Sequence, residues 1–165
     1  MITELDLVRM HRLQQEWDKA QRFTIPWTVE RDPRRELADQ VEALALDMLA
    51  GRGHFCIPTR HKEHFDLLVE GVRIEVKAAN WDGEKYTCQL RSNRADVLVW
   101  ACLDGAAHWF VIPFGEVAGL KALKISQHDP RDYHGKWMRY YGAWEIVDEL
   151  VAAGCNAWQP ALMEV

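Results

Sequence analysis

The chain has 165 residues, of which 48% are hydrophobic and 27% are charged, and its formal net charge is −5. These values are ordinary for a single soluble domain with its own core, and the negative charge argues against a protein that binds nucleic acid without sequence preference. No apolar run approaches the roughly 18 residues that a membrane-spanning helix needs, so we expect no membrane partner.

The first residues carry acids and lack the apolar block of a signal peptide, which predicts a cytoplasmic location. The four cysteines are scattered, without a C-x-x-C motif, and we expect free, buried thiols. The charge is unevenly distributed, because residues 85–139 hold eight basic and five acidic side chains, whereas residues 1–50 hold seven basic and ten acidic ones. This pattern is compatible with a basic face on an acidic protein.

Helical periodicity dominates the first part of the chain. Apolar side chains are spaced for a helix over residues 4–22, and the proline of TIPWTV (24–29) ends that pattern. Asp32 followed by Pro33 then predicts the N-cap and first residue of a second helix, which should run to about Ala50 and stop at residues 51–53.

Strand-like segments come next, separated by turn signals, at residues 54–58, 65–69, 72–79, 86–91, 95–103 and 108–113. A short helix is expected around Glu116, a further strand at LKIS (123–126), and a last helix from Lys136 to Ala153 with an apolar face rich in aromatic residues. The pattern predicts an α/β fold with a mixed, largely antiparallel sheet flanked by helices. We expect one domain (1–165), with an N-terminal helical extension (1–31), a core (32–113) and a C-terminal helical part (114–165).

Charged residues interrupt the two strands FDLLV and VRIEVKAA. If Glu70 and Gly71 form a two-residue hairpin loop, the cross-strand partners are Val69 and Val72, Leu68 and Arg73, Leu67 and Ile74, Asp66 and Glu75, Phe65 and Val76, and His64 and Lys77. One face is then apolar, and the other holds two carboxylates side by side, a costly arrangement that needs a compensating cation. Lys77 supplies one charge, and a divalent Mg²⁺ or Mn²⁺ would supply two more. The alternative is a surface hairpin whose polar face meets water, and a longer loop would change the register.

Asp66, then eight intervening residues, then Glu75-Val76-Lys77 resembles the signature of the PD-(D/E)xK, or restriction-endonuclease-like, nucleases. The preceding segment resembles the family's E-x-x-A-x-x-x-L-x-x-x-G helix at Glu42, Ala45, Leu49 and Gly53, and the later strands resemble its core strands, so that the likeness covers about residues 36–113. His64-Phe65 stands where the motif has its proline. The resemblance implies a core of order αβββαβ.

The resemblance also implies metal-dependent hydrolysis of DNA phosphodiester bonds. Asp66, Glu75 and the carbonyl of Val76 would hold Mg²⁺, with Mn²⁺ as a substitute and Glu42 as a direct or water-bridged ligand. Lys77 would orient the attacking water and stabilise charge on the phosphate. Glu42 could instead be an exposed helix acid, since Asp39 lies on nearly the same face.

Further candidates are weaker. We predict DNA contacts by basic and polar side chains around this site and in a later loop, namely His64, Gln89, Arg91, Arg94, His134 and Lys136. Gln89 could instead belong to a solvated strand edge, and the aromatic residues between 133 and 144 are better explained as core. A zinc site is a lesser alternative, with the ligand types of His54, Cys56, His61 and His64 but no known spacing.

The sequence therefore predicts a Mg²⁺-dependent DNA endonuclease of restriction, homing or junction-processing type. The alternatives are a module of the same fold that binds nucleic acid or assembles without cutting, and an unrelated α/β protein that matches by chance. Because cutting both strands of a duplex with one site per chain usually takes two copies, a homodimer or higher homo-oligomer is expected.

Overall fold

The computed structural model of the chain describes residues 32–59, 65–91 and 94–158, with side chains described as far as Gly154. The helix predicted at residues 4–22, and with it the extension 1–31, lies outside the described residues, as do His61 and His64. Within the described segments, no helix has both the length and the apolar character needed to cross a membrane.

Helix α2 (Pro33–Gly51) begins and ends where the sequence predicts. The carboxylate of Asp32 caps it by accepting a hydrogen bond from the backbone N–H of Arg34 at 3.0 Å. Pro33 occupies the first turn, where the N–H that proline lacks would have no partner within the helix. The chain leaves the helix through Gly53, whose φ of +92° lies in the left-handed region that glycine adopts without strain.

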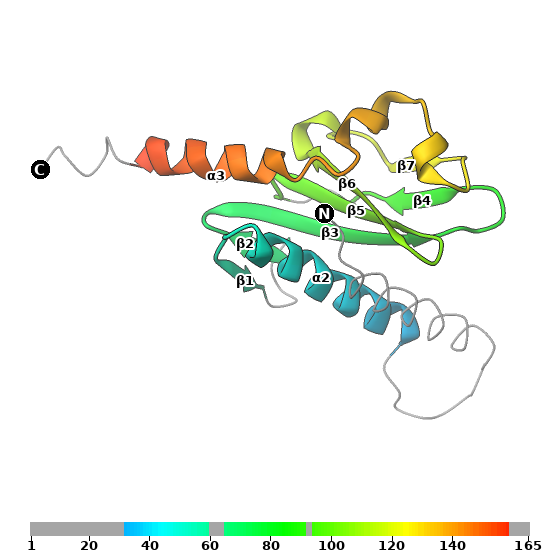
Figure 1. The fold of residues 1–165 in the computed structure, drawn as a ribbon, viewed down its shortest axis with the longest axis horizontal. Helices are drawn as coiled ribbons and strands as arrows, with labels where there is room; N and C mark the ends of the chain where they lie inside the picture. Colours follow the sequence, from blue (N-terminus) through cyan, green and yellow to red (C-terminus); the bar gives the residue numbers. More distant parts are fainter. Residues whose placement is uncertain (1–31, 60–64, 92–93, 159–165) are drawn as a thin grey trace, which may run out of the picture.

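A five-stranded mixed sheet forms the centre of the molecule, in the order β1-β2-β3-β5-β6 (Figure 1). Its strands are β1 (Cys56–Pro58), β2 (Leu67–Val69), β3 (Val72–Asn80), β5 (Val97–Leu103) and β6 (Ala107–Pro113). Strands β3 and β5 are parallel, and the other neighbouring pairs are antiparallel. The predicted α/β class, with a mixed and largely antiparallel sheet flanked by helices, is confirmed.

The connection from β3 to its parallel neighbour β5 contains strand β4 (Tyr86–Gln89), where the order αβββαβ has a helix. Strand β4 pairs antiparallel with β7 (Ala122–Ile125), the strand expected at LKIS, and the two form a separate sheet. We call this sheet the β4–β7 ribbon. Its buried side chains pack on the central sheet, so the ribbon covers the face that a crossover helix would otherwise cover.

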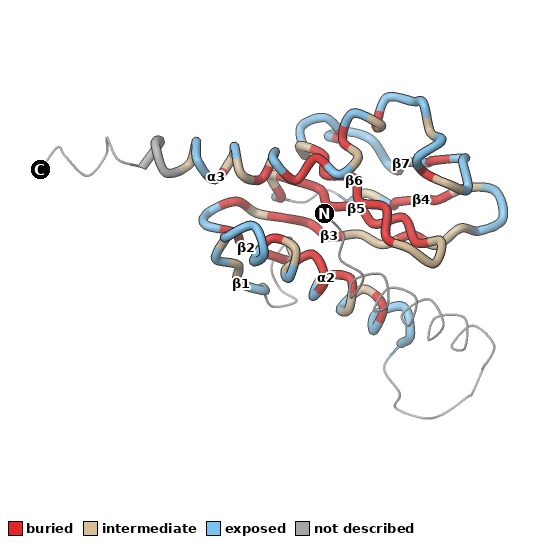
Figure 2. The backbone as a smooth tube through the Cα atoms, in the orientation of Figure 1, coloured by how far each residue is buried: buried red, intermediate tan, exposed pale blue. Residues whose placement is uncertain are grey.

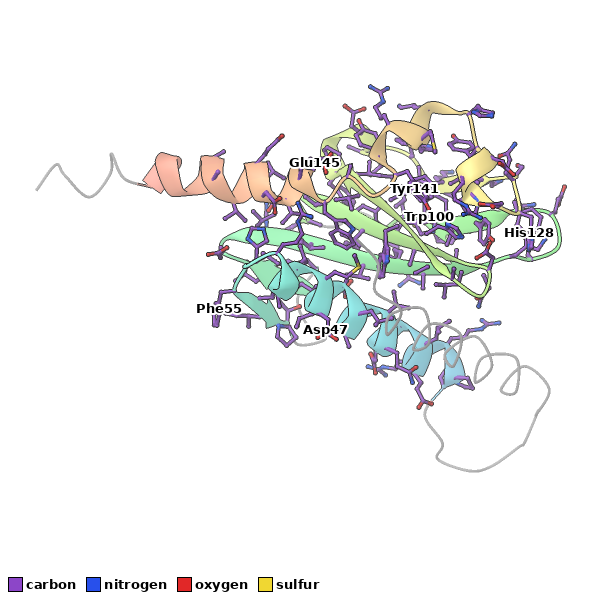
Figure 3. All side chains as sticks on the ribbon, in the orientation of Figure 1. Asp47, Phe55, Trp100, His128, Tyr141 and Glu145 are labelled. Carbon is purple, nitrogen blue, oxygen red and sulfur yellow. The ribbon has the colours of Figure 1, made fainter. Side chains whose placement is uncertain are left out.

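Each face of the central sheet packs against its own hydrophobic core (Figure 2). Helices α2 and α3 (Glu145–Trp158) cover one face, where Leu44 and Val147 pack with Ile74 of β3. The β4–β7 ribbon and the 3₁₀ helix η3 (Lys136–Tyr140) cover the other face, around the fully buried Trp100 of β5 (Figure 3). Two shorter 3₁₀ helices, η1 (Phe114–Glu116) and η2 (Pro130–Asp132), connect these parts, and η1 confirms the short helix expected at Glu116.

The single helix predicted from Lys136 to Ala153 is wrong in its first half. The chain there forms η3, then an isolated bridge between Tyr141 and Phe110, and α3 begins only at Glu145. The interruption lies at Gly142, whose φ of +63° is incompatible with a continuing right-handed helix and whose N–H donates to the carbonyl of Trp109 at 2.7 Å. Trp137, Tyr140 and Trp144 are buried as expected and Tyr141 is half-buried, but these residues divide between the cores on the two faces of the sheet.

Candidate active site

The hairpin between β2 and β3 has the register that the sequence predicts next to its turn. Leu67 pairs with Ile74, Leu68 with Arg73 and Val69 with Val72. Glu70 and Gly71 form the loop with φ of +48° and +92°, as in the two-residue turns whose twist matches that of paired strands. The apolar face of the hairpin therefore points into the core shared with α2 and α3.

The predicted register ends at Leu67, and Asp66 does not pair directly opposite Glu75. The N–H of Asp66 donates to the carbonyl of Ile74 at 2.8 Å, although Ile74 is already the partner of Leu67. Two consecutive residues thus oppose one residue of β3, which is the arrangement of a β-bulge. Such bulges end regular pairing and redirect a side chain, and here the redirected side chain is that of Asp66.

The carboxylate of Asp66 turns back onto the edge of β3. Its Oδ2 accepts a hydrogen bond from the backbone N–H of Val76 at 2.7 Å. In a β-strand, the N–H and C=O of one residue point to the same side, so the carbonyl of Val76 is directed to the edge at which Asp66 lies. The carboxylate and the carbonyl that the sequence assigned to one site are therefore held at the same edge by the backbone itself.

Glu75 and Lys77 lie two residues apart on β3 and point to the face that the β4–β7 ribbon covers. Their parallel-strand partners, Leu98 and Trp100, belong to the core on that face. Glu75 is only 8% exposed, and its Oε1 forms an ion pair with Nζ of Lys77. A buried carboxylate held by a neighbouring ammonium agrees with the predicted pairing of the two in one site.

The electrostatics of Glu75 and Lys77 show that this ion pair lacks full compensation. Burial raises the pKa of Glu75, and the charge of Asp66 raises it further, against the opposing effect of Lys77. Burial alone would lower the pKa of Lys77, but the hydrogen bond to Glu75 and the charges of Glu75 and Asp66 outweigh it and raise that pKa. Both pKa values are raised, as expected where the ammonium of Lys77 lies near more than one carboxylate.

Glu42 joins the group from α2, the helix on the opposite face of the sheet. Burial raises its pKa to about 7, and the charges of Asp66, Asp39 and Glu75 contribute to the shift, while Lys77 opposes it. A half-buried carboxyl that senses both Asp66 and Glu75 is not an ordinary exposed helix acid. The structure therefore brings Glu42, Asp66, Glu75 and Lys77 into one electrostatic group, with Asp39 as a neighbour.

The donors of this group are of the type that suits a divalent cation. Two carboxylates and a backbone carbonyl are hard oxygen ligands. Burial first, and then the charges of neighbouring carboxylates, raise the pKa values of Glu42 and Glu75, and Mg²⁺ or Mn²⁺ would favour the ionised form of both. Within residues 32–59, 65–91 and 94–154, no three side chains of His, Cys, Asp or Glu are close enough to hold a metal ion by themselves. The fit thus depends on the Val76 carbonyl completing the set.

Cys88 of β4 is a neighbour that the sequence interpretation left out of the site. It is buried on the inner side of the ribbon, and burial raises the pKa of its thiol to about 12, while the charge of Lys77 lowers this pKa and that of Glu75 raises it. Gln89, the next residue, is exposed on the opposite face of β4. The alternation of Tyr86 and Cys88 with Thr87 and Gln89 was readable in the sequence, but which side faces β3 depends on how the ribbon packs.

The predicted DNA contacts lie on the surface where they are described. Gln89, Arg91, Arg94, His134 and Lys136 are exposed. His64 lies outside the described residues, so its predicted position beside Lys77 stays a prediction.

The alternative of a zinc site is not supported at His54, its first proposed ligand. Both ring nitrogens of His54 already contact carboxylates, with Nδ1 at 2.9 Å from Glu70 Oε2 and Nε2 at 2.5 Å from Asp148 Oδ1. The thiol of Cys56 donates to the carbonyl of His54 at 3.7 Å. These contacts join the end of α2, the β2–β3 turn and α3, and they indicate a structural role for His54.

No family model and no curated protein matches the chain. Among solved structures, it is similar to a bacterial homing endonuclease, I-Ssp6803I, with a TM-score of 0.63 and 19% sequence identity. The alignment covers 74% of this chain and 98% of the other. At this identity, the likeness shows that the two proteins share a fold.

Proposed function

We propose that this chain is a metal-dependent endonuclease of the PD-(D/E)xK superfamily that hydrolyses phosphodiester bonds in DNA. The observation that carries the proposal is that Asp66, Glu75 and Lys77 lie at β3 where the pairing with β2 ends, with Glu42 of α2 near enough for its pKa to respond to the charges of all three. These are the residue types and the spacing of the superfamily's motif. The shared fold with a bacterial homing endonuclease supports the same conclusion.

The residues divide the chemistry among them. Asp66 accepts a hydrogen bond at Oδ2 from the N–H of Val76, which orients its carboxylate at the strand edge. Glu75 holds the ammonium of Lys77 on the same face. Lys77 remains 34% exposed at its side chain, so it can donate a hydrogen bond to an entering phosphate or to the water that attacks it. Glu42, whose pKa is raised to about 7 without metal, can lose its proton at neutral pH when a metal ion binds.

A Mg²⁺ ion held by Asp66, Glu75 and the carbonyl of Val76, with Glu42 as a direct or water-bridged ligand, would polarise the scissile phosphate and lower the pKa of a bound water. The same donors accept Mn²⁺, which also prefers oxygen ligands.

The first test is cleavage of supercoiled plasmid by the wild type and by Lys77→Ala, each with Mg²⁺, with Mn²⁺ and with a chelator. We expect the wild type to nick or linearise the plasmid only with metal, and Lys77→Ala to lose at least about 100-fold in rate, as is typical when one transition-state donor is removed. Lys85→Ala is the matched control, because the ammonium of Lys85 pairs with the neighbouring Glu84 rather than with the site residues, so the variant should leave the rate unchanged. Equal rates in Lys77→Ala and Lys85→Ala would contradict the proposed role of Lys77.

A wild type that cuts neither plasmid nor branched DNA, yet is stabilised by metal, would favour the non-cutting module of the same fold. A wild type that is neither activated nor stabilised by metal would instead contradict the proposed metal site, and with it the proposed activity.

A further inference from the structure

The outer face of the β4–β7 ribbon points away from the central sheet. Its inner side chains, Tyr86, Cys88, Leu123 and Ile125, are almost fully buried against the central sheet. The outer side chains alternate with them, as Thr87 pairs with Lys124 and Gln89 pairs with Ala122. The N–H of Leu90 donates to the carbonyl of Lys121 at 2.9 Å, which extends the pairing to the neighbourhood of Arg91 and Leu120.

We define the ribbon face as the outer side chains of this extended pair, namely Thr87, Gln89, Arg91, Leu120, Ala122 and Lys124. Four of the six are exposed, including Leu120, an apolar residue with 43% of its surface in solvent. Two of the six are basic and none is acidic, on a chain whose net charge is −5. A positive, partly apolar face on an acidic protein is complementary to a polyanion with apolar groups between its charges.

The chemistry of the ribbon face matches the edges of base pairs. A glutamine amide pairs with adenine and an arginine guanidinium with guanine, each through two hydrogen bonds, while threonine, alanine and other apolar side chains contact the thymine methyl group. The shape also matches, since the major groove of B-DNA, about 12 Å wide, admits a two-stranded β-ribbon. Lysine on such an element reaches the phosphates that line the groove.

The ribbon lies next to the candidate active site. Strands β3 and β4 pack together, and the inner residue Cys88 is a neighbour of Lys77 and Glu75.

We propose that the ribbon face enters the major groove of duplex DNA beside the cleaved bond and reads its sequence there. The inference rests on the proposed nuclease function for its substrate, and it adds the element that selects the site. It assigns base contacts to Gln89 and Arg91 and a phosphate contact to Lys124.

The test measures binding in a chelator, so that it does not depend on cleavage. Wild type, Gln89→Ala, Lys124→Ala and the control Arg34→Ala, an exposed cation on α2, each select binding sites from a randomised duplex library. We expect Gln89→Ala to lose about 5- to 150-fold of the preference at one base-pair position, with an unchanged dependence on salt. Lys124→Ala should weaken binding to all sequences and reduce the salt slope by about 0.9, whereas Arg34→Ala should change neither quantity.

Melting temperatures keep the result interpretable, because Gln89 and Lys124 are exposed and their variants should melt like the wild type. If Lys124→Ala has a lower melting temperature than the wild type, the variant Lys124→Gln is used in its place. Unchanged site selection in Gln89→Ala together with an unchanged salt slope in Lys124→Ala would overturn the proposal, as would a wild type that binds no duplex or prefers single strands. If the wild type nevertheless cleaves plasmid in the presence of metal, only the proposal for the ribbon face fails, and the proposed nuclease function stands. If the variants change site selection as expected but no preparation cleaves DNA, the proposal for the ribbon face is supported and the proposed nuclease function is contradicted.

Discussion

At the scale of single residues, the burial of the carboxyl groups of Glu42 and Glu75 near the charge of Asp66 is the property that most needs an explanation. Lys77 is the cation that opposes the raised pKa of both Glu42 and Glu75, among the residues that the structure describes. A fold without a use for this site could replace one of the acids by a neutral side chain and gain stability. The arrangement therefore predicts that the acids destabilise the metal-free protein.

Glu42→Gln tests this prediction through pH. The pKa of Glu42 is about 7 in the fold and about 4.5 in the unfolded chain, so the folded state binds the proton more strongly and loses stability as pH rises through this range. In a chelator, Glu42→Gln should be more stable than the wild type by on the order of 2 kcal/mol at pH 8 and equal to it at pH 4, measured by urea unfolding.

Glu36→Gln is the matched control, because Glu36 is exposed on the first turn of the same helix. Its difference from the wild type should change little between pH 4 and pH 8. The same small change in Glu42→Gln would make Glu42 an ordinary helix acid, which is the alternative that the sequence left open.

At the scale of elements, a cluster of charged side chains ties the end of α2 and the β2–β3 turn to α3. His54 contacts Glu70 on one side and Asp148 on the other, and Arg52 Nε donates to Asp148 Oδ1 at 3.2 Å. Burial alone would lower the pKa of His54, but the hydrogen bonds to Asp148 and Glu70 outweigh it, and the net pKa is raised above 6.5. The cluster therefore holds best when His54 is charged.

Asp148→Asn should weaken this cluster most at low pH. The stability that a raised histidine pKa contributes is fully present below pH 6.5 and is lost as pH rises through the folded-state pKa. We expect Asp148→Asn to cost about 1–2 kcal/mol at pH 6 and less at pH 9, where the pair with Arg52 is what remains. Glu149→Gln, one residue later and exposed, should show no such trend in the same thermal or urea unfolding series. A cost independent of pH would assign the effect to Arg52 rather than to His54.

The elements also show which features of this fold a sequence can predict. Local signals were sufficient where the deciding contacts are local, as at the Asp32-Pro33 start of α2 and the Glu70-Gly71 turn. The bulge at Asp66 was not predictable, because it depends on the carboxylate of Asp66 competing for the N–H of Val76 ten residues away. The break at Gly142 was missed because a regular aromatic spacing outweighed one glycine.

Predicting the candidate site was easier than predicting its surroundings. Asp66, Glu75 and Lys77 were candidates because of the hairpin pattern and its resemblance to the nuclease motif, and Glu42 because its helix resembles the family's helix, although the expected pairing of Asp66 with Glu75 is not formed. The pairing of β4 with β7 joins segments more than thirty residues apart in the chain, and strand periodicity carries no information about such partners. Hence Cys88 and the ribbon face emerge only from the folded molecule.

At the scale of the whole molecule, metal binding should be coupled to both stability and pH. A ligand that binds only the folded state raises the free energy of unfolding by about 2.7 kcal/mol at one hundred times its dissociation constant, or about 5–10 °C in melting temperature for a chain of this size. Because Glu42 must lose a proton whose pKa is about 7, Mn²⁺ should raise the melting temperature more at pH 8 than at pH 6. Asp66→Asn should abolish the shift, whereas Lys77→Ala should keep it and still fail to cut DNA, since Lys77 is not a ligand. Loss of the metal shift in Lys77→Ala with retention in Asp66→Asn would reverse the proposed roles of the two residues.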